Sequence, residues 1–186
     1  MDLGCGEGDF TKRLSYESWV GPICGAEISK YASKICYKKG VKTVLFDGKN
    51  LPFKYDTFDL IIMREVYEHI AFSDKMDVLF EIRRVLKNQG YLVITTPNKW
   101  DITRFLYRLK GEPWYAFTDE THVGLTTPLG LKDNLKKSNF TVILLSSIGI
   151  ELPSLGIRFR LINSGFNKLF IPRYILQGLV AIARKE

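Results

Sequence analysis

The sequence predicts a doubly wound, mostly parallel α/β sheet that ends in an antiparallel hairpin. Over residues 1–97, short apolar runs typical of buried strands alternate with amphipathic helical patterns. The run 58–63 is apolar except at Asp59, which is typical of a parallel strand covered on both faces. A glycine-rich turn at 4–8 joins the first strand to the first helix. In such a sheet, with right-handed crossovers, ligands bind outside the carboxyl ends of the strands.

The composition is that of one globular domain covering residues 1–186, with 46% hydrophobic and 25% charged residues. The formal net charge of +7 suits an anionic substrate, nucleic acid or lipid headgroups, but solvated surface lysines give the same sum. Three cysteines without a Cys-x-x-Cys pair favour a reduced, cytoplasmic location, and we assign no metal ligands. No apolar run approaches the roughly twenty residues that span a bilayer.

The turn Gly4-Cys5-Gly6-Glu7-Gly8 is the feature around which the other elements are organised. Glycine at alternate positions allows positive φ and lets a ligand lie against the main chain at the mouth of a helix. The spacing differs from that of a phosphate-binding P-loop and from the Gly-x-Gly-x-x-Gly of dinucleotide sites. A nucleotide, S-adenosylmethionine or a tight corner without a ligand all remain compatible with this turn alone.

Helix boundaries in the first half follow from caps and breakers. Phe10 begins a helical face directly after the glycine turn. Ser29 caps a second helix that stops near Gly40, and Ser73-Asp74 opens a third that we expect to stop at 88–90. Strands are expected at 1–3, 23–26, 41–46, 58–63 and 91–95.

The second half departs from this alternation. Two irregular segments, 98–126 and 149–173, are predicted to be insertions that form a lid over the active edge. Between them, Thr127-Pro128 caps and opens a helix, followed by a strand at 140–145. A last strand at 174–183 would close the sheet as an antiparallel hairpin.

Acidic side chains fall at the ends of three successive predicted strands: Asp2, Glu27 and Asp47. A carboxylate after the second strand can accept both hydroxyls of a ribose, and one after the third can accept the amine of adenine. Either residue alone could instead cap a helix or a turn. The presence of both carboxylates, Glu27 and Asp47, in register with the glycine turn favours a nucleoside site.

Several separated stretches together carry a family resemblance. They are Asp2-Leu3-Gly4-Cys5-Gly6-Glu7-Gly8, Glu27, 47–53, 58–62 with Glu65 and Glu68-His69-Ile70, 84–98 and, more loosely, 122–140. With these motifs the chain resembles class I S-adenosylmethionine-dependent methyltransferases of the small-molecule type, grouped with ubiquinone and menaquinone biosynthesis enzymes. The resemblance covers residues 1–147 and implies a Rossmann-like methyltransferase fold with S-adenosylmethionine as cofactor.

The resemblance also implies a set of cofactor-binding residues. They are Asp2, Gly4, Gly6, Gly8, Glu27, Ile28, Asp47, Gly48, Arg64 and Glu65. In this assignment the glycines pass close to the methionine part of the cofactor and Asp2 organises the turn. Glu27 holds the ribose, while Asp47 holds the adenine amine.

The remaining four residues of this set fall into two pairs with different expected roles. Ile28 and Gly48 would line the adenine base. Arg64 and Glu65 would lie beside the methyl group, although related enzymes often carry a smaller or uncharged residue at that point.

The reaction expected from the resemblance is methyl transfer to a small-molecule acceptor, with lipophilic or sugar-linked acceptors as options. The sulfonium methyl is already activated, so alignment and exclusion of water supply much of the acceleration. A phenol acceptor also needs a base, and His69 and His122 are the only histidines. A structural role for each histidine is the alternative.

Other sequence features bear on partners. The aromatics Trp100, Trp114, Tyr115 and Phe117 could stack on a planar acceptor or pack the insertion itself. A basic apolar stripe within 157–173 suits either peripheral membrane contact or packing on its own domain. Nucleic acid is disfavoured because no Asn-Pro-Pro-Tyr-like segment follows the fourth strand. A non-catalytic cofactor-binding protein and an RNA- or protein-directed methyltransferase remain as alternative functions.

The first strand is unusually short. Only Met1, Asp2 and Leu3 precede the glycine turn, whereas a central strand usually needs about five residues. We therefore expect the sequence to be a fragment or to begin at a misassigned start. The oligomeric state is not predictable from these patterns.

Overall fold

The computed structural model describes residues 1–148, 150–152, 157–159 and 177–186. Its main feature is a seven-stranded sheet in the order β3-β2-β1-β4-β5-β9-β6. The strands are β1 (Asp2–Leu3), β2 (Gly25–Glu27), β3 (Thr43–Leu45), β4 (Phe58–Arg64), β5 (Leu86–Pro97), β6 (Phe140–Ile148) and β9 (Gly178–Lys185). The predicted doubly wound sheet is confirmed.

The pairing divides the sheet into a parallel part and an antiparallel part. The five strands β1 to β5 run parallel to one another. β9 lies between β5 and β6 and is antiparallel to both, which confirms the closing hairpin. A separate antiparallel pair joins β7 (Ile150–Leu152) to β8 (Ile157–Phe159).

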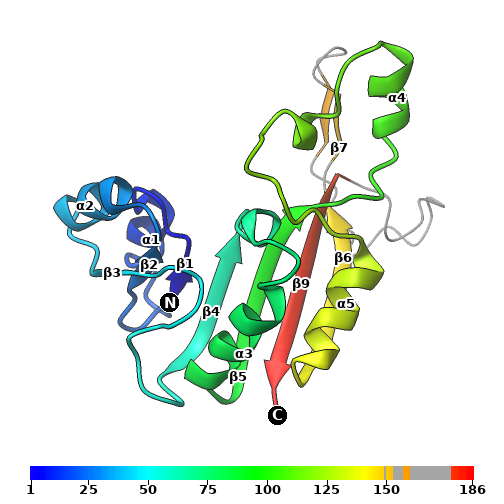
Figure 1. Ribbon diagram of the computed structural model, residues 1–186. Helices are drawn as coiled ribbons and strands as arrows, with labels where there is room; N and C mark the ends of the chain where they lie inside the picture. The colour runs from blue at the N-terminus through cyan, green and yellow to red at the C-terminus, as the bar shows by residue number, and fades with distance from the viewer. Residues whose placement is uncertain (149, 153–156, 160–176) are drawn as a thin grey trace.

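The helices connect the parallel strands and cover the sheet. They are α1 (Asp9–Leu14), α2 (Lys30–Lys38), α3 (Lys75–Val85), α4 (Arg104–Leu109) and α5 (Pro128–Lys137), with short 3₁₀ turns η1 (Tyr67–His69) and η2 (Tyr115–Phe117). Ser29 accepts from the Ala32 N–H and Thr127 from the Gly130 N–H, as predicted for helix caps. In Figure 1, α3 and α5 lie on one face of the sheet and α4 stands beyond the carboxyl ends of the parallel strands.

The predicted end of α3 at 88–90 is wrong. The helix ends at Val85 and β5 begins at the next residue. Pairing between β4 and β5 shifts register between Phe58 and Leu60, and Gln89 adopts a φ of 63°. The breaker residues therefore form an irregularity inside a long strand, because a bulge absorbs them without ending the pairing.

One core lies between the central strands and their covering helices. Its fully buried members include Ile61, Met63, Leu79, Ile82 and Leu92. Burial of these side chains from β4, α3 and β5 supplies the main hydrophobic stabilisation of the parallel part. This packing fixes the carboxyl ends of β1, β2, β3 and β4 relative to one another, and the candidate site lies at those ends.

The segment 98–126 leaves the sheet and returns to it. A parallel bridge joins Asn98 to Thr126, so both ends of the segment lie side by side. Inside it, Trp114 is 3% exposed and its indole N–H donates to Asp101 over 2.7 Å. Trp114 thus packs the segment itself, while Trp100 and Phe117 are exposed. The predicted lid role stays a prediction, and most of the second segment, 149–173, lies outside the described residues.

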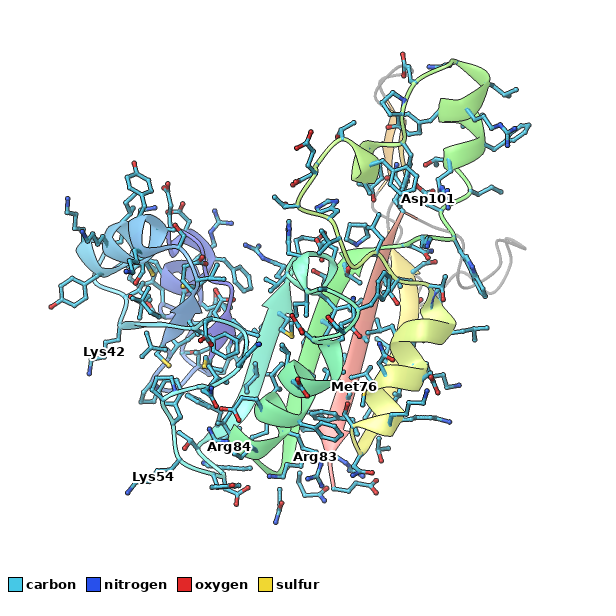
Figure 2. The ribbon with its side chains drawn as sticks, viewed as in Figure 1. Lys42, Lys54, Met76, Arg83, Arg84 and Asp101 are labelled. Carbon is cyan, nitrogen blue, oxygen red and sulfur yellow. The ribbon has the colours of Figure 1, made fainter. Side chains whose placement is uncertain are left out.

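No helix among the described residues is long and apolar enough to cross a membrane. Cys5, Cys24 and Cys36 are all free thiols. Many basic side chains, such as Lys42 and Lys54, are exposed and point away from the sheet (Figure 2). Part of the positive net charge is therefore solvated on the surface.

Candidate cofactor and acceptor site

The glycine turn has the backbone geometry that its sequence predicts. Gly4, Gly6 and Gly8 have φ values of 74°, 54° and 84°. A Cβ on Gly4 would lie 2.3 Å from Cγ2 of Val66, so the turn also packs tightly against the segment after β4. Glycine is required at position 4 both for its positive φ and for this close approach.

Glu27 fastens the turn to the end of β2. Its Oε2 accepts from the Gly6 N–H over 2.8 Å, and its Oε1 accepts from the Ser29 N–H over 2.9 Å. The side chain is buried, at 8% exposure. Because an ionised carboxylate offers about four acceptor positions, both oxygens keep capacity for ribose hydroxyls.

Asp2 is buried between β1 and α1, where its Oδ2 accepts a hydrogen bond from the Thr11 hydroxyl. Burial raises the pKa of this carboxyl above its usual range. The structure therefore gives Asp2 contacts suited to holding the turn against the first helix. It lies behind the turn and is not among the residues that line the pocket.

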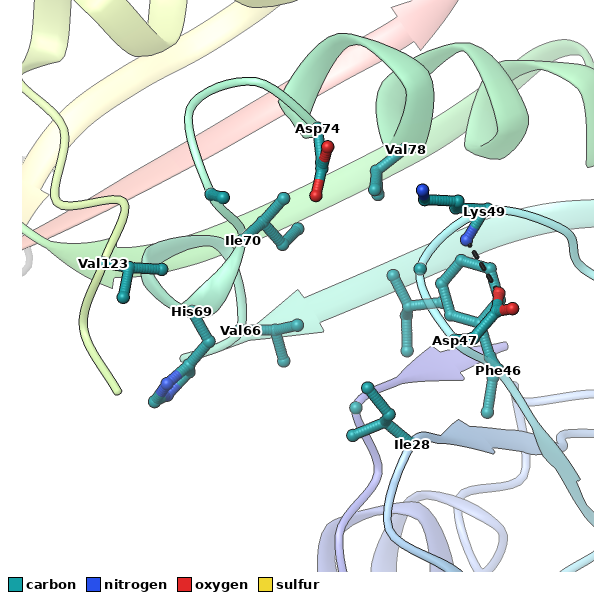
Figure 3. A pocket seen from close by; sticks show the side chains of 15 residues that line it. Ile28, Phe46, Asp47, Lys49, Val66, His69, Ile70, Asp74, Val78 and Val123 are labelled. Atoms are coloured by element: carbon teal, nitrogen blue, oxygen red, sulfur yellow. Dashed lines mark hydrogen bonds between the residues drawn. The ribbon is translucent and has the colours of Figure 1, made fainter. Parts of the chain in front are cut away.

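A pocket of about 320 Å³ opens at the carboxyl ends of β1 to β4 (Figure 3). It is lined by several residues that the sequence singled out, namely Gly4, Ile28, Asp47, Gly48 and His69. Asp47 accepts from the Lys49 N–H over 3.0 Å, and this backbone hydrogen bond lowers the pKa of its carboxyl. The pocket thus combines apolar walls with an ionised acceptor at one end.

These residues fit S-adenosylmethionine. Ile28, Phe46 and Val66 give apolar walls for an adenine ring, and Asp47 on the same wall offers acceptors for its amine. Glu27 holds spare acceptor positions at the adjacent strand end, where a ribose would follow. When bound, the cofactor supplies a methyl group activated on a sulfonium sulfur.

Arg64 and Glu65 lie at the end of β4 but not among the residues lining this pocket. The Arg64 guanidinium is 4.0 Å from the centre of the Phe10 ring, a cation–π contact with α1. Glu65 has a φ of 53° and accepts from the Thr95 hydroxyl over 2.7 Å. Their predicted place beside the methyl group stays a prediction.

The two histidines come together from separate segments. Their ring centres are 4.8 Å apart, with His69 on η1 and His122 on the returning part of 98–126. Nδ1 of His122 lies 2.8 Å from the Ala116 carbonyl, and Nδ1 of His69 lies 2.8 Å from the Thr121 hydroxyl. Nε2 of His122 also lies 3.6 Å from a carboxylate oxygen of Asp119.

Two buried ionisable groups beside the histidines were not predicted from the sequence. Glu68 is 1% exposed and accepts from the Thr96 hydroxyl over 2.9 Å; burial raises its pKa to about 7. Lys75, also 1% exposed, donates to the carbonyls of Tyr67 and Gly124 over 2.9 and 2.6 Å. Burial lowers the pKa of Lys75 to about 7.

A sequence signal for Lys75 did exist. Lys75 shares the buried face of α3 with Val78, Leu79 and Ile82, so a lysine stands where the helical period requires an apolar residue. Such a lysine is rarely buried without a partner, and its presence points to nearby acceptors. The identity of those acceptors depends on the fold.

The sheet order, the glycine turn after β1 and the acidic residue at the end of β2 define a class I S-adenosylmethionine-dependent methyltransferase domain. Comparison with known proteins agrees with this assignment. Residues 1–145 match the family model described as a methyltransferase domain. The chain belongs to this family.

Individual relatives agree with the family. A demethylmenaquinone methyltransferase of Thermotoga maritima is 34% identical over 122 residues, which are 63% of this chain and 52% of that protein. An uncharacterized protein of Methanocaldococcus jannaschii is 34% identical over 94 residues, which are 50% of this chain and 42% of that protein. The chain spans about half the length of these curated relatives.

Solved structures share the fold. An S-adenosylmethionine-dependent methyltransferase of Thermotoga maritima superposes with a TM-score of 0.75 at 20% identity, covering 100% of this chain and 80% of that one. A methyltransferase of Archaeoglobus fulgidus gives a TM-score of 0.72 at 22% identity, covering 99% of this chain and 84% of that one. At these identities the likeness supports the fold, and the acceptor has to be argued from the site.

Proposed function

We propose that the protein transfers a methyl group from S-adenosylmethionine to a small-molecule acceptor that enters from the side of His69 and His122. One observation carries this proposal: His69 lines the same pocket as Gly4 and Asp47. The pocket assigned to the cofactor therefore borders His69, whose ring centre lies 4.8 Å from that of His122. A relative that is a demethylmenaquinone methyltransferase supports a lipophilic acceptor as the first class to screen.

The residues of this chain have separable tasks in the proposal. Glu27 and Asp47 orient the nucleoside part of the cofactor, while the glycine turn keeps side chains away from the rest of it. The segment 98–126 excludes water on the acceptor side. Where the acceptor must lose a proton, His69 or His122 takes it through Nε2, because both Nδ1 atoms are held by neighbouring groups.

The cofactor site is tested by calorimetry with S-adenosylhomocysteine on the wild type, Glu27→Gln and Glu17→Gln. Glu27→Gln keeps one carbonyl acceptor but loses the paired charge-assisted acceptors, so we expect affinity to fall about tenfold or more. Glu17 is exposed and serves as the matched control. Equal binding by all three proteins, or none by the wild type, would contradict the proposal.

Two alternative functions predict different results. A non-catalytic cofactor-binding protein would bind S-adenosylhomocysteine but show no turnover with any acceptor. An RNA-directed enzyme would bind RNA with an affinity that falls steeply as salt rises. We propose a cytoplasmic location because all three cysteines are free, with peripheral membrane contact as the arrangement that would suit a lipophilic acceptor.

A further inference from the structure

We infer that Glu68, His69 and His122 form a binding site for a divalent transition-metal ion beside the cofactor pocket. One potential ligand atom from each residue lies within 4.8 Å of the others. Two of these residues belong to η1 and the third to the segment 98–126, so only the folded chain assembles the site. The role given to the ion below rests on the proposed methyl transfer, whereas its binding does not.

Both imidazoles are oriented as metal ligands are. The Ala116 carbonyl can only accept, so Nδ1 of His122 is a donor, and in the neutral imidazole Nε2 presents a lone pair. The Thr121 hydroxyl donates to Asp119, so its oxygen accepts from Nδ1 of His69. In the neutral form of His69, Nε2 therefore presents a lone pair as well. A ligating histidine typically donates its other N–H in this way to a carbonyl, a carboxylate or another fixed acceptor.

Glu68 supplies the carboxylate. Its side chain is buried and receives a hydrogen bond from Thr96, which fixes one oxygen. Among the described residues Glu68 forms no ion pair, because the nearby Lys75 ammonium is directed at the carbonyls of Tyr67 and Gly124. A buried carboxylate without an ion pair is stabilised by a bound cation.

Hydrogen bonds join η1 to the segment 98–126, the two parts of the chain that carry the ligands. The Gly124 N–H donates to the Glu68 carbonyl over 2.7 Å, and Lys75 bridges Tyr67 to Gly124. Ligands at roughly 2.1 Å from one ion stand about 3.4 Å apart in a tetrahedron. The present limit of 4.8 Å exceeds this separation by about 1.4 Å, so binding would draw the three side chains closer together.

Two imidazoles and one carboxylate suit Zn²⁺, Mn²⁺, Fe²⁺ or Co²⁺ better than Mg²⁺ or Ca²⁺, which prefer oxygen ligands. Three protein ligands leave positions open for an exogenous group, the arrangement of catalytic zinc sites. The open position would take a hydroxyl or carboxylate oxygen of the acceptor. In the loaded protein the histidines are then ligands, and ionisation of the acceptor by the metal replaces their role as bases.

For a phenol or enol acceptor, methyl transfer to the oxygen conserves atoms and electrons. Its hydroxyl proton leaves to solvent when the oxygen binds the cation. The oxygen lone pair then forms a C–O bond with the methyl carbon while the S–C bond breaks, and that electron pair stays on sulfur. No oxidant or reductant is consumed.

Titration of the full chain with Co²⁺ and with Zn²⁺, without cofactor or acceptor, tests the site. We expect one ion per chain, with visible Co²⁺ absorption and no intense sulfur-to-metal band. His69→Ala, His122→Ala and Glu68→Gln should each weaken binding at least tenfold, whereas Glu120→Gln, an exposed change on the same segment, should not.

Circular dichroism and S-adenosylhomocysteine calorimetry separate loss of the site from loss of the fold. Variants that bind S-adenosylhomocysteine normally but not Co²⁺ support the metal site. Unchanged Co²⁺ binding in the three variants, or no stoichiometric binding by the wild type, overturns it. A wild type that binds Co²⁺ but not S-adenosylhomocysteine would leave this site standing while the proposed function fails.

Discussion

The cofactor side and the acceptor side of the pocket are built in different ways. On the cofactor side, Glu27 accepts backbone N–H groups from Ser29, two residues away, and from Gly6 in the turn that follows the adjacent strand. On the acceptor side, Glu68, Lys75 and the histidines are held by contacts between η1, α3 and the segment 98–126. The proposed cofactor contacts thus depend on backbone groups at two adjacent strand ends, whereas the proposed acceptor side depends on packing between elements far apart in the chain.

Gly124→Ala should have the largest effect on stability, because it disrupts the contact between the region following η1 and the segment 98–126. A Cβ at this position would lie 2.0 Å from the Ile70 carbonyl oxygen. We expect a loss of about 4 kcal/mol in the free energy of unfolding, measured in urea. Gly21→Ala, whose Cβ meets open space, is the control. Equal stability of the two variants would show that the segments are not packed as described.

Gly4→Ala should act on the cofactor side. Its φ of 74° and the 2.3 Å approach to Val66 predict a loss of about 3 kcal/mol in unfolding free energy. S-adenosylhomocysteine affinity should fall by far more than in Gly111→Ala. Gly111 has a φ of 70° but its Cβ would meet nothing, so Gly111→Ala measures the energetic cost of the positive φ without a steric contact. If both variants bind alike, the close approach is not needed for cofactor binding.

Lys75→Met should reveal the buried ammonium through pH. The pKa of Lys75 is lowered to about 7 by burial, from 10.5, so the folded state disfavours its proton. Wild-type stability attributable to this group is therefore lost as pH falls from about 10.5 to about 7 and is constant below that. Relative to Lys75→Met, the wild type should lose about 3 kcal/mol or slightly more between pH 10 and pH 7.

Urea unfolding of the two proteins at several pH values measures this difference. Lys99→Met, at an exposed position, should show no such trend and serves as the control. A stability difference between wild type and Lys75→Met that is flat across the range would mean that Lys75 is solvated.

Removing one helix cap on each side gives the smallest and most sensitive comparison. Ser29→Ala removes the cap of α2, and Thr127→Ala that of α5. Each should cost about 1 kcal/mol in unfolding free energy. Only Ser29→Ala should also weaken S-adenosylhomocysteine binding slightly, because fraying of the first turn of α2 loosens the position of the backbone N–H at residue 29 that donates to Glu27. An equal effect of both on binding would mean that the two sides are coupled.

Several predictions from the sequence are confirmed because they depend on short-range chemistry. The glycine turn needs positive φ, Ser29 and Thr127 supply side-chain caps, and the run 58–63 forms a parallel strand. This strand is fully buried on one face only, that of Ile61 and Met63, and not covered equally on both faces as predicted. The stop at 88–90 is wrong because strand pairing overrides the local breaker signal. Roles for the site residues remain predictions.

The sequence by itself determined the parallel sheet, the antiparallel closure, the glycine turn and the family, since each follows from periodicity or from short motifs in the sequence. Only the tertiary structure decided that Glu68 is buried beside His69 and His122, and that Lys75 bridges Tyr67 to Gly124. Local patterns fix backbone conformation, whereas the meeting of η1 with the segment 98–126 depends on how the core orients elements far apart in the chain.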